Sequence, residues 1–215
     1  MAMFASRQDA GLKLGRCLQD QGVRADLVLG LPRGGVIVAA EVARALHLPL
    51  DVLLVRKIGH PWHREFAVGA LGEDGVAVLD EEAIGPNALL RAELEAVIKE
   101  EKERLRSYQA RFHPNGAPAF AGKTVLLVDD GLATGATMEA GVLSVRKQNA
   151  RSIVVAAPVA SAHAVERLAR VADEVRVLKM DPNFEAVGQY YDAFAQTTDE
   201  EVLEVLKAGG RMRDA

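Results

Sequence analysis

The chain has 215 residues, 26 of them Lys or Arg and 30 Asp or Glu, and 49% of the residues are hydrophobic. This is the composition of one ordinary globular domain, and at this length folding buries roughly 70% of the surface that the unfolded chain exposes, so the core needs no disulfide or metal. The one cysteine, Cys17, cannot form an internal disulfide and excludes a Cys-rich metal site. A net charge of −4 gives no electrostatic reason to expect nucleic-acid binding.

The hydrophobic runs are too short to cross a membrane. Residues 27–31 and 124–128 have the length of strands, whereas a bilayer needs about 20 apolar residues in a helix. Residues 1–7 lack the basic start and apolar stretch of an export signal. Together with the lone cysteine, which fits a reducing compartment, these features predict a cytoplasmic protein with no membrane partner.

Short runs of Val, Ile and Leu, with helical stretches between most of them, define the expected fold. The predicted strands lie at 28–29, 52–55, 125–128, 153–156 and 175–178, and three of the predicted helices at 36–46, 137–149 and 163–171. Strands that are apolar throughout indicate a sheet buried on both faces. The sequence therefore predicts an α/β fold, a doubly wound, mainly parallel sheet with flanking helices, with ligands at the carboxyl ends of the strands.

Two segments depart from this alternation. Residues 59–75 contain four glycines, one proline and the only tryptophan without a clear period, which predicts a long functional loop. Residues from about 86 to 113 predict an inserted helix, whose charged residues we interpret as a solvated face rather than a partner-binding surface. Its apolar stripe consists of Leu90, Leu94, Val97, Ile98, Leu105 and Tyr108.

The stretch from Thr124 to Thr137 carries the clearest chemical signal. An apolar strand runs into Asp129 and Asp130, and then into a turn of Gly, Ala and Thr that opens a helix. The turn and the helix start can present backbone N–H groups and hydroxyls to a phosphate, and the two carboxylates can bind sugar hydroxyls or Mg²⁺. An ordinary turn and helix cap would explain the glycine and threonines, but would not require paired carboxylates after a buried strand. The combination predicts a site for a 5-phosphorylated ribose.

Residues Val125–Thr137 resemble the thirteen-residue phosphoribosyl pyrophosphate (PRPP) signature of the type I phosphoribosyltransferases. The resemblance implies catalytic roles for Asp129 and Asp130. It also implies that the 5-phosphate of PRPP is bound by Ala133, Thr134, Gly135, Ala136 and Thr137.

Two upstream segments are similar to other parts of the same family. The turn at Arg33, Gly34 and Gly35 resembles the pyrophosphate loop, although glycines in such a turn can also serve its backbone geometry alone. Arg56 and Lys57 resemble the pair that precedes the flexible catalytic loop of adenine-type members, which implies a catalytic role for both as cations that stabilise the leaving pyrophosphate; the alternative is an exposed basic pair.

The loop after Arg56 and Lys57 would then close over PRPP and exclude water. Within it, His60, His63 and Glu65 are candidates for proton transfer, with polar loop residues as the alternative interpretation of the histidines. The remaining histidines, His113 among them, are not accompanied in the sequence by other residues with which they would form a site.

The C-terminal region, 181–192, resembles the hood of purine-type phosphoribosyltransferases. The resemblance implies that Phe184 stacks on an acceptor base, that the backbone around Val187 reads its edge, and that Asp192 helps to hold a metal. A packing patch is an equal account of the neighbouring Tyr190 and Tyr191. Ala133 stands where hypoxanthine-type members have Asp, and 156–161 lacks their base-reading Lys; these departures argue against a 6-oxopurine acceptor, and Ala133 is compatible with adenine-like members.

The resemblance implies a magnesium-dependent enzyme that transfers the 5-phosphoribosyl group of PRPP to a nitrogenous acceptor, a nucleobase in our interpretation, and releases pyrophosphate. We expect one domain over 1–215, with a flexible loop at 59–75, a helical insertion at about 86–113 and a hood from about 179–215. PRPP and a small-molecule acceptor are the expected partners, and a homo-oligomer is left open. The alternatives are a PRPP-sensing regulator without turnover, and a phosphatase or phosphorylase of phosphorylated ribosides.

Overall fold

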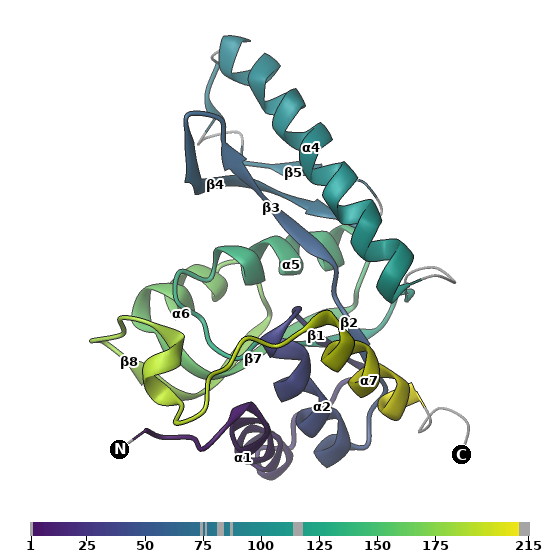
Figure 1. Cartoon of the computed structure of the whole chain (residues 1–215), viewed down its shortest axis with the longest axis vertical. Coiled ribbons are helices and arrows are strands. Elements are labelled where there is room, and N and C mark those ends of the chain that lie inside the picture. The colour runs from purple at the N-terminus through teal and green to yellow at the C-terminus, as the bar shows by residue number, and fades with distance from the viewer. Residues whose placement is uncertain are drawn as a thin grey trace.

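The computed structural model describes residues 2–73, 75, 77–80, 84–86, 88–113 and 118–210, and its central element is a five-stranded sheet (Figure 1). The strand order is β2-β1-β6-β7-β8, and all four neighbouring pairs are parallel. The strands are β1 Leu27–Gly30, β2 Leu50–Val52, β6 Thr124–Val128, β7 Ser152–Ser161 and β8 Glu174–Asp181. The predicted mainly parallel α/β fold is confirmed.

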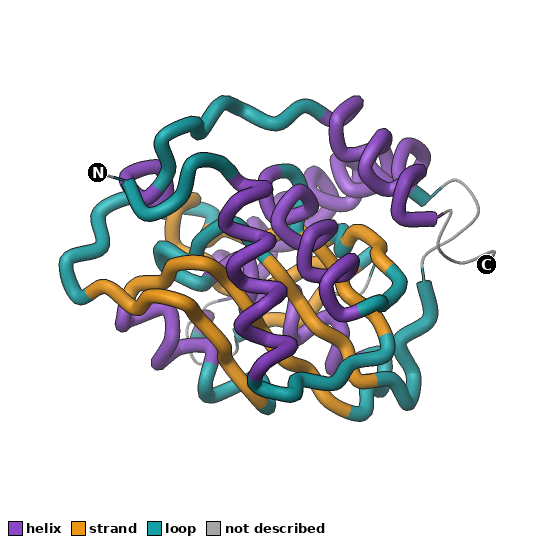
Figure 2. The backbone as a smooth tube through the Cα atoms, turned by 90° about the horizontal axis from the view of Figure 1, so that it is seen from below, coloured by secondary structure: helices purple, strands orange, loops and turns teal. Residues whose placement is uncertain are grey.

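Helices cover both faces of this sheet (Figure 2). Helices α1 Arg7–Asp20 and α2 Gly34–Leu46 pack on one face, and helices α5 Ala136–Lys147 and α6 Ala162–Leu168 on the other. Within one strand, Leu126 and Val128 join the first cluster, while Val125 and Leu127 join the second. Successive side chains of a strand point to opposite faces, so a sheet covered on both sides needs apolar residues at every position.

The C-terminal part of the chain returns to the main sheet. Helix η1 Val187–Tyr190 contacts β7, and helix α7 Asp199–Gly210 packs against α2 and β2. Among the residues that the structure describes, no helix combines the length and apolar character needed to span a membrane.

The second sheet corrects two predictions. The run at 52–55, expected as one strand, is divided, because β2 ends at Val52 and the chain then enters β3 Val55–His60 of a separate antiparallel sheet. The expected loop at 59–75 is wrong, since most of it forms β4 His63–Gly72, which pairs with β3 and with β5 Ala77–Leu79. Closure of this segment over a ligand stays a prediction.

Irregular pairing explains why the hairpin has no visible period. The register between β3 and β4 shifts on both sides of Gly59, which breaks the alternation of apolar and polar residues. At Gly69 a Cβ atom would lie only 2.5 Å from the carbonyl oxygen of Val78. Glycine therefore appears in this strand because another backbone approaches closely, not because the segment is a loop.

Helix α4 Ala88–Phe112 covers the second sheet and lies within the segment predicted as a helical insertion (Figure 1). Four members of its predicted stripe, Leu90, Leu94, Val97 and Leu105, are buried against β3 and β4. We call β3–β5 together with α4 the arm, because these elements form a unit of their own beside the main sheet.

A buried polar cluster joins the arm to the main sheet. His113, which follows α4 and has a side chain only 5% exposed, places Nδ1 2.6 Å from Glu73 Oε1 and Nε2 3.0 Å from Asp51 Oδ1. Glu73 follows β4, whereas Asp51 belongs to β2. Burial alone would lower the pKa of His113, but the hydrogen bonds to Asp51 and Glu73 outweigh it and raise the pKa to about 9. The expectation that His113 belongs to no group of interacting polar residues is therefore wrong.

We predict that His113 makes stability depend on pH. Because the pKa in the folded state, about 9, exceeds the ordinary value of 6.5, the contribution is complete below pH 6.5 and is lost as the pH rises through 9; the shift corresponds to about 3 kcal/mol. In urea unfolding, the difference in free energy between the wild type and His113→Gln should be largest near pH 6 and shrink toward pH 10. Replacing the exposed His163 by Gln should leave the profile unchanged, and a pH-independent difference for His113 would contradict the assignment.

Candidate functional site

The candidate site is built around an acidic pair at the carboxyl end of β6. Asp129 and Asp130 follow the strand directly, and Asp129 Oδ1 accepts a hydrogen bond from the backbone N–H of Asp130 at 2.8 Å. Burial and the adjacent Asp130 carboxylate raise the pKa of Asp129 well above its usual range. Open parallel sheets bind their ligands at this edge.

Asp130 is held by Arg7, a residue that no local sequence pattern connects with the acidic pair. Arg7 Nε donates to Asp130 Oδ2 at 2.7 Å, and a terminal nitrogen of Arg7 donates to the carbonyl oxygen of Ala195 at 2.7 Å. The guanidinium carbon of Arg7 lies 3.9 Å from the ring centroid of Phe194. The Tyr191 hydroxyl donates to the carbonyl oxygen of Asp130 at 2.6 Å. Arg7 thus links the acidic pair to the C-terminal segment.

The glycine turn after β1 lies directly against the acidic pair. A Cβ atom on Gly35 would lie 2.7 Å from Asp129 Oδ1, and one on Gly34 would overlap Asp130 Oδ2. Only glycine allows this approach at either position. The structure therefore brings together two of the sequence-predicted motifs, which lie almost 100 residues apart in the chain.

The predicted phosphate-binding turn begins helix α5. Gly135 has a φ of +72°, a left-handed conformation that favours glycine, and the Ala136 N–H donates to Thr134 Oγ1 at 3.3 Å. Ser161 Oγ supports the turn by donating to the carbonyl oxygen of Ala133 at 2.6 Å. Ala133, Thr134 and Thr137 are exposed at the positive end of a helix of 12 residues, an arrangement suited to an anion.

A cavity of about 710 Å³ lies between the arm and two of these motifs, which it reaches at Arg33 beside the glycine turn and at Thr137 in the first turn of α5. Arg56 and Lys57 line it as well, so the three predicted cations and one residue of the phosphate motif share one space. Helix α4 supplies another wall, through Glu100, Glu101, Arg104, Leu105 and Tyr108. Arg104 is exposed and pairs with Glu100 one turn earlier, as expected for a solvated face, whereas Glu101 is buried and departs from that interpretation.

The predicted hood and metal residues do not line this cavity. Phe184 contacts Tyr190, with ring centroids 5.4 Å apart. Val187 packs on Gly131, where an added Cβ would lie 2.5 Å from Val187 Cγ1, and so sits beside the acidic pair. Tyr190 and Tyr191 are buried, which agrees with the packing interpretation. Asp192 is exposed, and its backbone N–H donates to the carbonyl oxygen of Phe4 at 2.9 Å; its metal-binding role stays a prediction.

The candidate proton-transfer residues flank the β3–β4 turn, with His60 at the end of β3 and His63 and Glu65 at the start of β4. The rings of His60 and His63 have centroids 5.5 Å apart, and His60 also contacts Trp62 and Phe66. The Glu65 side chain lies outside the described residues. The catalytic roles proposed for this group stay predictions.

The acidic pair is the best candidate for holding a metal. In the described part of the chain, no group of three His, Cys, Asp or Glu side chains could hold an ion by itself. Magnesium usually takes one or two protein carboxylates and completes its shell with water and substrate phosphates. Asp129 and Asp130 fit a magnesium ion that binds with a polyphosphate substrate.

A comparison with models of protein families shows to which family the chain belongs. Residues 12–195 match the model described as phosphoribosyl transferase domain. The chain belongs to this family. The phosphoribosyl transferase family model thus covers both the glycine turn and the acidic pair, the two motifs that the fold places in contact.

The chain is also similar to individual proteins. The protein TT1426 from Thermus thermophilus, known from a crystal structure, is 46% identical, with a TM-score of 0.85 over 94% of this chain and 97% of that one. A Mycobacterium tuberculosis H37Rv protein named "Putative phosphoribosyl transferase Rv0571c" is 42% identical over 212 residues, 98% of this chain and 48% of the relative. The chain therefore spans about half the length of the curated relatives that it matches first. A ribose-phosphate pyrophosphokinase from Thermococcus kodakarensis is 37% identical over 84 residues, 38% of this chain and 30% of the relative.

We predict that Arg7 and Asp130 are energetically coupled. Arg7→Met removes the partner of a mostly buried carboxylate and should lower the free energy of unfolding by about 1–3 kcal/mol. A double-mutant cycle with Asp130→Asn, measured by urea unfolding, should give a coupling of about 0.5–3 kcal/mol. Arg16→Met, an exposed position on the same helix, should change stability by less than about 0.5 kcal/mol. Equal effects of Arg7→Met in the wild-type and Asp130→Asn backgrounds would contradict the coupling.

Proposed function

We propose that this domain transfers the 5-phosphoribosyl group of PRPP to a nitrogenous acceptor, a nucleobase, and releases pyrophosphate. The observation that carries the proposal is the contact of the glycine turn, Gly34 and Gly35, with the acidic pair, Asp129 and Asp130. It joins a candidate pyrophosphate turn to candidate ligands of the ribose hydroxyls. Membership in the phosphoribosyl transferase domain family supports the same reaction class.

The proposed roles follow from charge and position. The turn at Thr134 and Gly135 binds the 5-phosphate with backbone N–H groups and the positive end of α5. Asp129 and Asp130 orient the ribose hydroxyls. Arg33, Arg56 and Lys57, which share the cavity, stabilise the negative charge that develops on the departing pyrophosphate.

Magnesium is the proposed cofactor, with Asp129 and Asp130 as the residues that would hold it. When bound, it would supply positive charge to the pyrophosphate oxygens. The protein residues do the rest: they fix C1 of the ribose against the acceptor nitrogen, and no covalent nucleophile is needed.

The proposed acceptor is adenine-like rather than a 6-oxopurine. Ala133 offers no carboxylate beside Thr134, and 156–161 contains no lysine. Phe184 and Val187 are the proposed acceptor hood, and Val187 already lies against Gly131, next to the acidic pair. Phe184 is partly exposed and could present a ring face to a base.

We predict that PRPP with magnesium stabilises the fold. A ligand bound only by the native state raises stability by mass action, by about 2.7 kcal/mol at 100 times its dissociation constant. Thermal unfolding with and without millimolar PRPP and MgCl₂ tests this, with ribose 5-phosphate and pyrophosphate as separate controls. An unchanged melting temperature would contradict the proposed function.

We also predict that turnover depends on the acidic pair. Asp129→Asn and Asp130→Asn keep the side-chain shape but remove charge, so both variants should fold while pyrophosphate release from PRPP falls at least tenfold for each, in keeping with the loss of a charged hydrogen bond. The assay uses adenine, hypoxanthine, guanine, uracil and orotate as acceptors, and Asp20→Asn, an exposed change, as the matched control. PRPP binding without pyrophosphate release from any base would favour a PRPP-sensing regulator, and release of phosphate instead would favour the phosphatase or phosphorylase alternative.

A further inference from the structure

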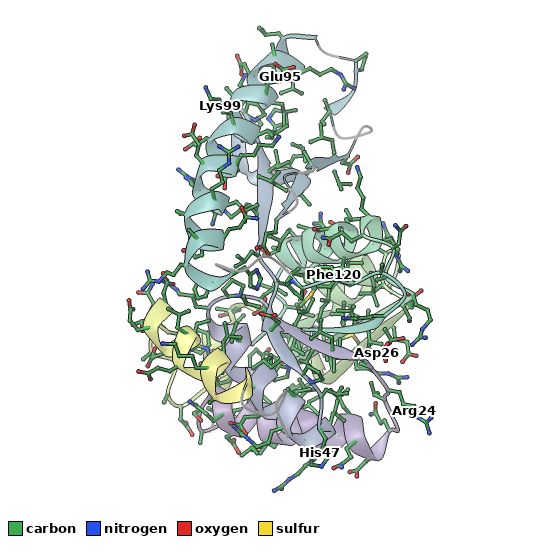
Figure 3. The ribbon with its side chains drawn as sticks, turned by 90° about the vertical axis from the view of Figure 1, so that its right-hand side faces the viewer. Arg24, Asp26, His47, Glu95, Lys99 and Phe120 are labelled. Carbon is green, nitrogen blue, oxygen red and sulfur yellow. The ribbon has the colours of Figure 1, made fainter. Side chains whose placement is uncertain are left out.

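Helix α4 carries a carboxylate at a position where its buried stripe requires an apolar side chain. Val97 and Leu105 are eight residues apart, and Glu101 occupies the position midway between them. Only 6% of Glu101 is exposed, whereas Glu95 and Lys99 are exposed and lie on the outer side of the helix (Figure 3). Glu101 is thus a core position occupied by an acid.

The Glu101 carboxylate binds two arginines. Oε2 accepts from Arg56 Nε at 2.7 Å, and Oε1 accepts from a terminal nitrogen of Arg104 at 2.9 Å. Arg104 lies one turn further along the same helix, so that bond is local. Arg56 belongs to β3, 45 residues away in the chain. Glu101 therefore connects the wall of the cavity formed by α4 with a cation of the candidate site.

The bond to Arg56 uses only the edge of the guanidinium. Nε is engaged, and within the described part of the chain the two terminal nitrogens have no acceptor, so their four N–H groups can serve a ligand. The Arg56 side chain is 36% exposed and lines the cavity. Because the guanidinium is a rigid plane, fixing Nε also fixes the direction of the terminal nitrogens.

The stability of the fold does not explain why an acid occupies position 101. Moving a carboxylate out of water is costly, and replacement of buried ion pairs by apolar side chains of similar size is often neutral or stabilising. A leucine at 101 would continue the stripe formed by Leu94, Val97 and Leu105. The acid at this position requires a different explanation.

We propose that Glu101 is a positioning residue that directs the terminal nitrogens of Arg56 toward the pyrophosphate group of the substrate. This inference rests on the proposed function, since it requires that the cavity binds pyrophosphate. Helix α4 then takes part in the chemistry as the support of a catalytic cation, although it lies outside the motifs that resemble the family.

A role of Glu101 through its charge and a role through its position predict opposite effects of its removal on anion binding. If Glu101 acted only through its negative charge, its removal would strengthen the binding of an anion nearby. If it positions Arg56, its removal weakens binding although the site becomes more positive. Glu101→Leu and Glu101→Gln remove the same charge, but only Gln keeps an oxygen that can accept from Arg56 Nε.

The experiment is calorimetric titration of the whole chain with inorganic pyrophosphate in MgCl₂. Glu101→Leu should weaken binding roughly tenfold, the size expected when a charge-assisted hydrogen bond loses its alignment, and Glu101→Gln should stay within about threefold of the wild type. Glu101→Leu should cause no further loss in an Arg56→Met background, because the effect acts through Arg56. Glu103→Leu, an exposed change on the same helix, should leave the affinity unchanged.

Several results would overturn the inference. They are tighter or unchanged binding in Glu101→Leu, an equal loss in the Arg56→Met background, or reduced stability in urea with unchanged affinity, which would indicate a structural ion pair. If Glu101→Leu does not fold, Glu101→Asp serves instead, because it keeps the charge but withdraws the carboxylate from Arg56 and should also weaken binding. A wild-type chain that does not bind pyrophosphate would overturn the proposed function as well, whereas wild-type binding that Glu101→Leu leaves unchanged overturns the positioning role alone.

Discussion

Parallel pairing of β1 with β6 is the constraint on which the candidate site depends. Gly30 lies opposite Val128 in the register, and the N–H of Leu31 donates to the carbonyl oxygen of Val128 at 2.9 Å. Both strands therefore end at the same level, and the turns that follow them must share one space. Glycines at 34 and 35 allow that space to be filled by the carboxylates. A shifted register would separate the two turns and exchange the faces on which Leu126 and Leu127 are buried.

Apolar contacts build the arm, and apolar and polar contacts together attach it to the main domain. Inside the arm, α4 and the antiparallel sheet meet through apolar side chains such as Ile58, Val68 and Leu94. The arm also meets the main domain through apolar side chains, since Val55 and Ala70 of the arm belong to the same buried cluster as Met138 of α5. His113 with Asp51 adds a directional polar contact between the arm and β2, and Arg56 with Glu101 adds one within the arm, beside the cavity.

Local patterns could predict the contiguous parts of the site but not the contacts between distant segments. The strand, the acidic pair and the helix start between Val125 and Thr137 lie within a few residues of one another, so their geometry follows from their spacing. Arg7 and Asp130 are 123 residues apart, and no local pattern connects them. The β3–β4 hairpin was missed because irregular register and a close-packed Gly69 remove the alternation by which strands are recognised. Glu101 did leave a signal, as an acid at an apolar position of a helical stripe.

A segment near the N-terminus, residues 4–7, and the segment 190–195 meet beside the acidic pair. Phe4 pairs with Tyr191, and the N–H of Ala193 donates to the carbonyl oxygen of Ala5 at 3.0 Å. All five strands of the main sheet precede Tyr191 in the chain, so the sheet is synthesised before the residues that complete the surroundings of Asp130. Contacts of this kind can form only after synthesis has passed them, whatever the order in which the sheet itself assembles.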